Sequence, residues 1–179
     1  GTGSMENQIF TFDAPATPLI PNEFEMEGFV FSHWTYTDDN DQEQTLADQA
    51  SVRNLTSEPN GQVDLRAVFE ARTVIVTFLL NDGTGSTDGE FVTGQTEMRV
   101  AFDDTFADLY ITDPNSAIGL PSVRRVGYTF NGWFTEAENG TLVSAITNVD
   151  TVVDGDVPLN EQLTLTLYAH WSQNGLPVT

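Results

Sequence analysis

The chain has few side chains that could act as a nucleophile or a general base. It has two histidines and no cysteine in 179 residues. The missing thiols exclude disulfides, thiolate metal sites and a cysteine nucleophile. The histidines, His33 and His170, occupy non-equivalent positions of a repeated motif, and no spacing argues for a serine and a carboxylate beside either one. We expect His170 to face solvent or the rim of a strand, and we expect no enzymatic activity.

Carboxylates are the most abundant groups that could do chemistry: 27 Asp and Glu stand against six basic residues. Acid–base catalysis needs a carboxyl with a raised pKa in a pocket, whereas pairs such as Asp103–Asp104 fall on expected turns. Hard oxygen ligands suit Ca²⁺, and the candidate ligands are Asp39, Asp41 and Glu43. Their loop lacks the glycine and the final glutamate of an EF-hand. The expectation is no cofactor, with a Ca²⁺ site in this loop as the alternative.

The net charge of −21 limits the partners of the chain. It repels phosphate backbones and anionic membrane surfaces, so we expect no nucleic-acid partner. No segment approaches the ~20 consecutive apolar residues that span a bilayer. Such an acidic surface also discourages self-association, which favours a monomer. The absence of lysine removes the lysine–asparagine isopeptide cross-link. The basic residues are all arginine: Arg53, Arg66, Arg72, Arg99, Arg124 and Arg125.

Two segments share one aromatic signature, and this repetition indicates tandem modules. Gly28–Trp34 reads Gly-Phe-Val-Phe-Ser-His-Trp, and Gly127–Trp133 reads Gly-Tyr-Thr-Phe-Asn-Gly-Trp. Each is followed by a Thr-Leu pair and then by an alternating apolar strand, Val63–Phe69 or Leu163–Trp171. We place the boundary between the modules at Glu70–Arg72.

The elements around these signatures are mostly strands. Alternating side chains predict a strand over Ile9–Phe12, another over Thr73–Leu80 and a third near Phe91–Phe102. Asp103–Tyr110 is the best helix candidate, with an aspartate cap. Asn139–Gly140 predicts a hairpin turn. The opening strand of the second module has no equivalent in the first.

Strand periodicity places the aromatic residues of the signatures. In the first copy, Phe29, Phe31 and His33 should share one face, and Val30, Ser32 and Trp34 the other. A tryptophan in a repeated structural motif is more often a core anchor than a sugar platform. The residues expected in or beside the cores are Phe31, Trp34, Phe69, Phe130, Trp133 and Leu167.

The second signature, the Asn-Gly-Thr turn at 139–141 and the closing Leu167–Trp171 together resemble the Listeria-Bacteroides repeat, also called the internalin B B-repeat. The resemblance covers residues 72–173 well and the earlier part in a diverged form, with His33 where the motif has its second glycine. It implies an α+β, mostly β fold of two tandem β-grasp-like (ubiquitin/SUMO-like) modules, the first diverged or truncated. The expected organisation is a tag remnant at 1–5, modules at 6–71 and 72–173, and a linker at 174–179.

The last residues carry a second resemblance. Leu176, Pro177 and Thr179 form a Leu-Pro-x-Thr sequence similar to a sortase sorting signal. It implies attachment of the chain to peptidoglycan, and therefore an extracellular location at a bacterial cell wall.

These features together predict a non-enzymatic segment of a cell-surface adhesin that acts as a stalk or presents a distal region. A first alternative is a ligand-binding module in which Tyr36 and Phe134 contact a glycan or protein of a host or neighbouring cell. A second is an adhesin repeat stabilised by Ca²⁺.

Overall fold

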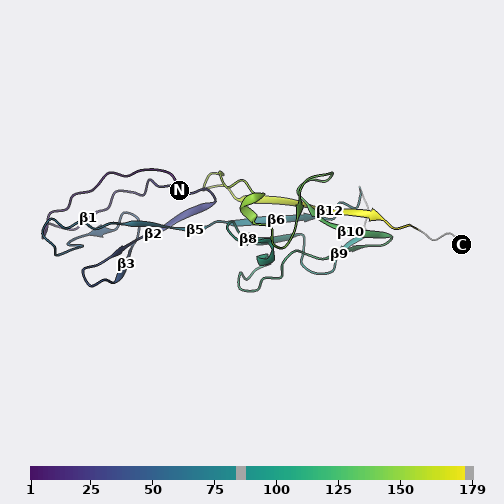
Figure 1. The fold of residues 1–179 in the computed structure, drawn as a ribbon, viewed down its shortest axis with the longest axis horizontal. Helices are drawn as coiled ribbons and strands as arrows, with labels where there is room; N and C mark the ends of the chain where they lie inside the picture. The colour runs from purple at the N-terminus through teal and green to yellow at the C-terminus, as the bar shows by residue number, and fades with distance from the viewer. Residues whose placement is uncertain (84–87, 176–179) are drawn as a thin grey trace. The chain divides into compact units, whose positions relative to one another are not determined.

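The structure, a computed structural model, describes residues 1–83 and 88–175. The chain divides into two compact units, Gly1–Glu70 and Ala71–Thr179 (Figure 1). Both are built mostly from strands, and the helices of the described ranges are two single 3₁₀ turns. A mostly β fold is therefore confirmed. The sorting-signal residues Leu176, Pro177 and Thr179 lie outside the described residues.

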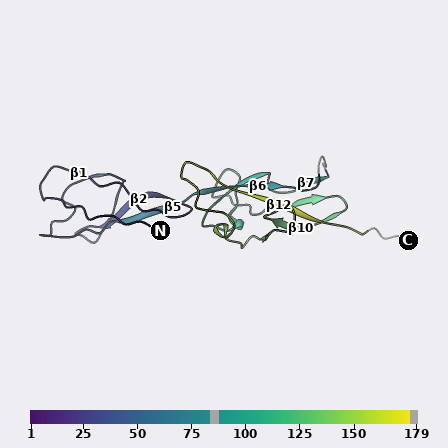
Figure 2. The same ribbon diagram turned by 90° about the horizontal axis from the view of Figure 1, so that it is seen from above.

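The second unit is organised around a five-stranded mixed sheet in the order β11-β10-β12-β6-β8. The long central strand β12 runs parallel to β6 on one side and antiparallel to β10 on the other (Figure 2). A separate antiparallel pair joins β7 to β9. The bounds are β6 Thr73–Leu79, β7 Gly89–Phe91, β8 Glu97–Ala101, β9 Val123–Arg125, β10 Tyr128–Phe134, β11 Leu142–Val143 and β12 Leu163–Gln173.

The core of this unit follows from the alternation along β6. Val74, Val76 and Phe78 point to the same side and are fully buried, as the period of two requires. Phe78 packs edge-on against Trp133, with ring centroids 4.8 Å apart. The indole nitrogen of Trp133 donates a hydrogen bond to the carbonyl of Pro121 at 2.8 Å. Because its only polar group has a partner, the tryptophan is buried without an unmet hydrogen bond.

The phenylalanine and the tryptophan of each signature contact each other, and in the second signature a β-bulge brings them together. The pairing of β10 with β12 shifts register between Phe130 and Gly132, so Phe130 and Trp133 contact each other at 5.5 Å. In the first copy Phe31 packs against Trp34 at 5.0 Å. The expected division of the first signature into two faces, with Phe31 opposite Trp34, is therefore wrong, because strict alternation does not hold through this segment.

The expected core residues lie in or beside the cores. Trp34, Trp133 and Leu167 are buried. The other three, Phe31, Phe69 and Phe130, are half-buried.

The predicted helix over Asp103–Tyr110 is wrong. Only Phe106–Asp108 is helical, as the 3₁₀ turn η1. The backbone N–H of Phe106 donates to the carbonyl of Thr147 at 3.2 Å, so a donor that could serve a longer helix is used by another segment. Thr105 caps the start of this turn, because both its N–H and its hydroxyl donate to the Asp108 carboxylate, at 3.2 and 2.7 Å. A second 3₁₀ turn, η2, covers Val149–Thr151.

Two further predictions concern turns. The strand expected near Phe91–Phe102 is split, because β7 ends at Phe91 and β8 begins at Glu97. Gly94, with φ of +74°, turns the chain between them. The hairpin turn at Asn139–Gly140 is confirmed: β10 pairs antiparallel with β11 across it, and both residues have positive φ, 65° and 71°, which asparagine and glycine adopt most readily.

The first unit has a smaller sheet, in the order β3-β2-β5, and a short antiparallel pair of β1 with β4. Its fully buried apolar residues are Leu19, Trp34 and Val52. The strand predicted over Ile9–Phe12 is wrong, since this segment forms no strand. The bounds are β1 Thr17–Pro18, β2 Phe29–Thr37, β3 Glu43–Leu46, β4 Ser51–Val52 and β5 Arg66–Ala71.

Candidate functional site

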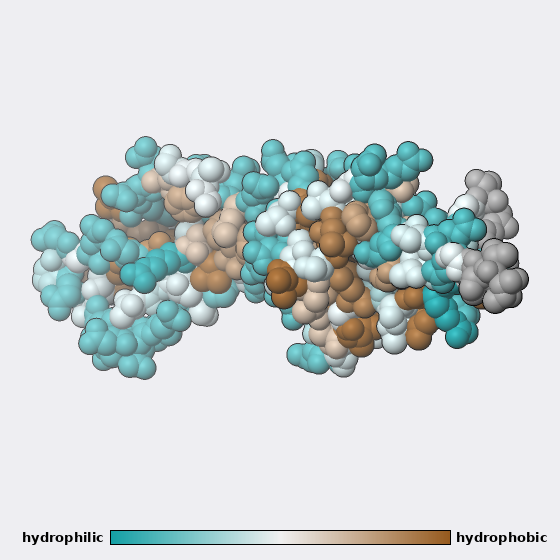
Figure 3. Space-filling view, turned by 45° about the vertical axis from the view of Figure 1, so that its right-hand side comes forward, coloured by the Kyte–Doolittle hydropathy of each residue, from teal (hydrophilic) through white to brown (hydrophobic). Residues whose placement is uncertain are grey.

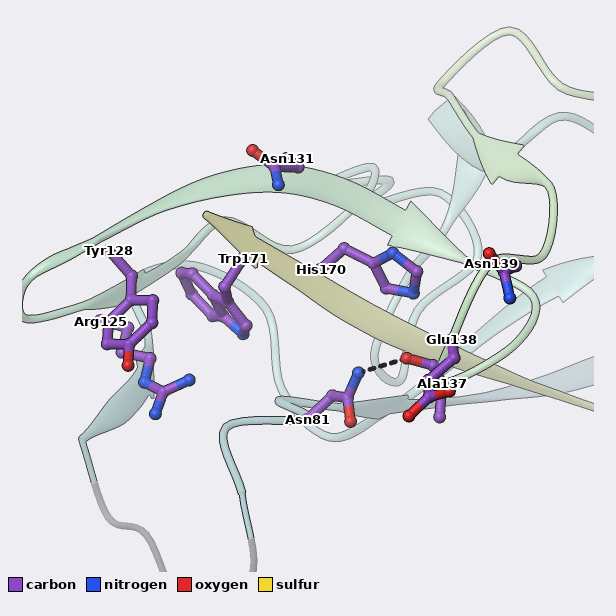
Figure 4. Close-up of a pocket in the computed structure, with 9 residues that line it drawn as sticks. All are labelled: Asn81, Arg125, Tyr128, Asn131, Ala137, Glu138, Asn139, His170 and Trp171. Atoms are coloured by element: carbon purple, nitrogen blue, oxygen red, sulfur yellow. Dashed lines mark hydrogen bonds between the residues drawn. The ribbon is translucent and has the colours of Figure 1, made fainter. Parts of the chain in front are cut away.

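A surface pocket of about 340 Å³ lies in the second unit, where β9, β10 and β12 meet the loops that follow β6 and β10 (Figure 4). Its walls combine aromatic rings, side-chain amides, a cation and the carboxylate of Glu138. The lining residues are Asn81, Arg125, Tyr128, Asn131, Ala137, Glu138, Asn139, His170 and Trp171.

Hydrogen bonds to backbone carbonyls hold the walls of this pocket. The indole nitrogen of Trp171 donates to Leu80 at 2.6 Å, and the amide of Asn81 donates to Ala137 at 2.9 Å. The Nε2 atom of His170 lies 2.9 Å from the carbonyl of Glu136. Because a carbonyl only accepts, Nε2 carries the proton. The pocket is therefore formed by side chains that are already fixed by the fold.

Arg125 contributes an unpaired cation to this pocket. Its guanidinium lies over the ring of Tyr128, 3.9 Å from the centroid, which is the geometry of a cation–π contact. Its Nε atom is buried without a hydrogen-bond partner in the described part of the chain. Figure 4 shows the guanidinium below the rings of Tyr128 and Trp171. A buried donor without an acceptor costs about 1–3 kcal/mol. Because this Nε is covered by protein atoms, a negative group in the pocket would interact with the guanidinium charge rather than with that atom.

Three other arginines of the chain are paired with carboxylates. Arg53, Arg99 and Arg124 form ion pairs with Asp13, Glu97 and Glu90, respectively. In a chain of net charge −21, carboxylates for such pairs are plentiful. The pairing of Arg125 with an aromatic ring rather than with a carboxylate therefore distinguishes it.

The lining of the pocket offers several kinds of surface to a ligand. Trp171 and Tyr128 offer ring surfaces, and three asparagines offer both donors and acceptors. This combination fits a small polar ligand that carries a negative group.

The aromatic residues predicted to contact a ligand lie elsewhere. Tyr36 is a half-buried residue of β2, aligned with Gln44 of β3. Phe134 is half-buried in β10 and stacks on His170, with ring centroids 3.9 Å apart and planes 11° apart. The two belong to different units. Phe134 supports one wall of the pocket through His170, which itself lines it.

The other histidine has a local role in the first unit. The Nδ1 atom of His33 lies 3.0 Å from the hydroxyl of Ser32, and that hydroxyl donates to the Glu70 carboxylate at 2.7 Å. The contact joins β2 to β5.

The predicted Ca²⁺ loop uses its first carboxylate to hold the chain. Asp39 accepts hydrogen bonds from the Thr56 hydroxyl at 2.8 Å and from both the N–H and the hydroxyl of Ser57 at 2.7 Å. The backbone N–H of Ser57, followed by the two hydroxyls, lowers the pKa of Asp39 below its usual value. Within residues 1–83 and 88–175, no group of three or more histidines or carboxylates is placed to hold a metal ion.

Sequence reasoning missed the pocket. The adjacent pair Arg124–Arg125 before the second signature was the available signal, because it is the only such doublet in a chain with six basic residues. The sequence alone does not show whether Arg124 or Arg125 contacts Tyr128. That depends on the pairing of β9 with β7, which aligns Arg124 with Glu90.

Comparison with known proteins identifies the second unit. The model of the Listeria-Bacteroides repeat domain matches residues 75–170, from β6 to the pocket residue His170. No curated protein and no solved structure matches the chain. No helix in the described residues is long and apolar enough to cross a membrane.

Proposed function

Because the chain belongs to the Listeria-Bacteroides repeat family, we propose that it is a non-enzymatic segment of a bacterial cell-surface adhesin. Its modules are β-grasp-like and space or present a distal binding region. The family is typical of bacterial surface proteins, and the central parallel pair of β6 and β12 fits a grasp-like sheet. The proposed location is extracellular, at the cell surface.

The observation that carries this proposal is the burial of the repeated signature. Trp133 is 2% exposed and Trp34 is 3% exposed. An aromatic platform for a ligand would have to present its ring to solvent. The signature therefore supports a role in building the module, and a module without a reaction centre is suited to spacing.

A substitution of the whole spacer tests the proposal. Residues 6–173 of the surface protein would be replaced by an unrelated rigid domain of similar length, and cell adhesion would be measured. A spacer role predicts that adhesion is retained. Loss of adhesion, with the protein still displayed, would show that the repeats themselves contact the partner.

We also propose that Leu176, Pro177 and Thr179 are read by a sortase, which cleaves the peptide bond after Thr179, releases the segment that follows and joins the Thr179 carbonyl to an amine of peptidoglycan. The motif follows β12, which ends at Gln173. In the native surface protein, Leu176→Ala should release the protein into the medium, whereas Val178→Ala at the variable position should leave it on the wall. Equal wall retention of both variants would contradict the assignment.

A second candidate function is ligand binding by the second unit, favoured by the unpaired Arg125 in its pocket. The partner would be a glycan or protein of a host or neighbouring cell that presents a carboxylate. Arg125→Ala should abolish binding to such cells, and Arg124→Ala is the matched control, because Arg124 pairs with Glu90. Tyr36→Ala and Phe134→Ala test the contacts proposed from sequence, and unchanged adhesion in both would remove those residues from the site.

A further inference from the structure

The first unit contains a copy of the opening strand that is not used as a strand. Ile9–Phe12 reads Ile-Phe-Thr-Phe, and Ile75–Phe78 reads Ile-Val-Thr-Phe. The second segment is the middle of β6, which lies between β8 and β12. The first segment has no strand partner, and its Ile9 and Phe12 side chains are 93% and 60% exposed. By contrast, Phe78, the equivalent of Phe12, is 1% exposed.

The place for such a strand is also open in the first unit. In β12, Leu163–Tyr168 pairs with β6, while Tyr168–Gln173 pairs with β10. The closing strand of the first unit, β5, begins only at Arg66 and is the edge strand of its sheet. If Arg66 is aligned with Tyr168, the missing part, Gly61–Leu65, corresponds to the part of β12 that pairs with β6. In the first unit, the part of the closing strand that would pair with an opening strand is therefore missing, and so is the opening strand itself.

The rest of the first unit keeps the arrangement of the second. The N–H of buried Leu19 donates to Ala50 at 3.0 Å, as the N–H of buried Phe106 donates to Thr147 at 3.2 Å. The short pairing of β1 with β4 corresponds to the isolated bridge between Thr105 and Asn148. Because the surrounding contacts agree, the position of an opening strand in the first unit can be taken from the second.

We propose that the first unit has a second state in which Ile9–Phe12 of the same chain docks as a parallel strand against Val63–Leu65. In the second unit Val76 aligns with Leu165 and Phe78 with Leu167. The same register places Phe10 beside Val63 and Phe12 beside Leu65. Phe12 then packs against Trp34, as Phe78 packs against Trp133.

Exposed polar contacts hold the segment in the undocked state. The N–H of Asp13 donates to the Asn54 side chain at 2.9 Å, and the Asn54 amide donates back to the Asp13 carboxylate at 2.9 Å. Arg53 pairs with the same carboxylate at 3.0 Å, with both side chains more than half exposed. Exposed pairs of this kind stabilise a conformation only weakly. Docking would bury Phe10 and Phe12, and this burial favours the docked state.

The same chain is the expected donor of the strand. A tethered segment has an effective concentration on the order of millimolar, about a thousandfold above a micromolar solution of a second copy. The net charge of −21 also opposes close approach of two copies.

Engineered cysteines can detect the docked state, because the chain has no cysteine of its own. Thr77 aligns with Thr166 in the second unit, and the equivalents in the first are Thr11 and Asp64. Under mild oxidation, Thr11→Cys/Asp64→Cys should form a disulfide within one chain at least about tenfold faster than the control Thr11→Cys/Glu58→Cys, because only aligned residues lie within bridging distance. Equal rates in the two pairs, or disulfides only between chains, would overturn the proposal.

A second measurement avoids cysteines. Phe12 and Ile9 are both exposed in the undocked state, so an aspartate at either position should be tolerated there. Docking would bury Phe12, whereas the equivalent of Ile9 is the half-buried Ile75. Phe12→Asp should therefore speed hydrogen exchange of the Val63–Leu65 amides by a factor that reports the docked population, about tenfold for a docked state that holds about nine-tenths of the molecules, and Ile9→Asp should change it less. Identical exchange in Phe12→Asp and the unaltered chain would refute docking.

Discussion

Gly132 of the second signature is a position where a single added methyl group should destabilise the fold. Its φ is +128°, a conformation that side chains other than hydrogen rarely adopt. A Cβ atom built there would lie 2.5 Å from Cδ1 of Leu142. We therefore expect Gly132→Ala to destabilise the second unit through backbone strain, through this contact, or through both.

The size of the effect can be worked out from these two terms. Backbone strain at such a φ costs about 1–3 kcal/mol. Replacing glycine by alanine also restricts the unfolded chain, which returns about 0.4–1 kcal/mol. Leu142 is 52% exposed, so the end of its side chain can move away at little cost. The expected net loss is about 1–2 kcal/mol, and it comes mostly from strain.

Urea unfolding monitored by hydrogen exchange in β10 and β12 measures this loss separately from the first unit. Leu142→Ala in the same background separates the terms, because it removes the contact and leaves the strain. Gly127→Ala is a control in open space, with φ of +80° and no atom within 4 Å of the new Cβ. Full recovery of stability in Gly132→Ala/Leu142→Ala would refute the assignment to strain, as would a loss below about 0.5 kcal/mol in Gly132→Ala.

Three further predictions follow from burial and hydrogen bonding. Phe106→Ala, at a fully buried side chain, should cost about 3–5 kcal/mol in urea unfolding, and a cost below 1.5 kcal/mol would contradict the packing of η1. The lowered pKa of Asp39 means that its contribution is present above the ordinary aspartate pKa and is lost as the pH falls through the folded value. Asp39→Asn should therefore lower the melting temperature at pH 7 but not at pH 2. The control Asp41→Asn should not show this difference between the two pH values. Addition of a chelator should leave the melting temperature unchanged, and a drop would restore the Ca²⁺ hypothesis.

The sequence was sufficient for the strands whose burial follows a simple period. β6 and β12 were predicted within a few residues, because their apolar side chains alternate without interruption. The first signature was misassigned, since a contact between Phe31 and Trp34 cannot be derived from a period of two. The helix at Asp103–Tyr110 failed for a different reason: the carbonyl of Thr147, far along the chain, accepts a hydrogen bond from Phe106. Local capping patterns do not contain such long-range partners.

The pocket was less predictable than the fold, because it combines side chains of β9, β10 and β12 with the loops that follow β6 and β10. Asn81 and Ala137 are joined by a side-chain hydrogen bond across the pocket wall, and neither belongs to a motif. Exposed apolar residues also do not mark the position of the pocket. Figure 3 shows hydrophobic residues gathered in patches among hydrophilic ones, and more than half of an ordinary protein surface comes from apolar atoms that have no function.

The arginines give a more specific guide to function than the net charge does. Arg72 donates to the carbonyls of Val157 and Glu161, both at 2.5 Å, and so fixes the loop before β12. With acidic residues in large excess, a cation on this surface can readily find a carboxylate. Arg125 instead lies over Tyr128 with a buried, unpartnered Nε. A loss of cell binding confined to Arg125→Ala would assign this pocket a partner, whereas equal binding by the Arg125→Ala and Arg124→Ala variants would leave the second unit with the spacer role alone.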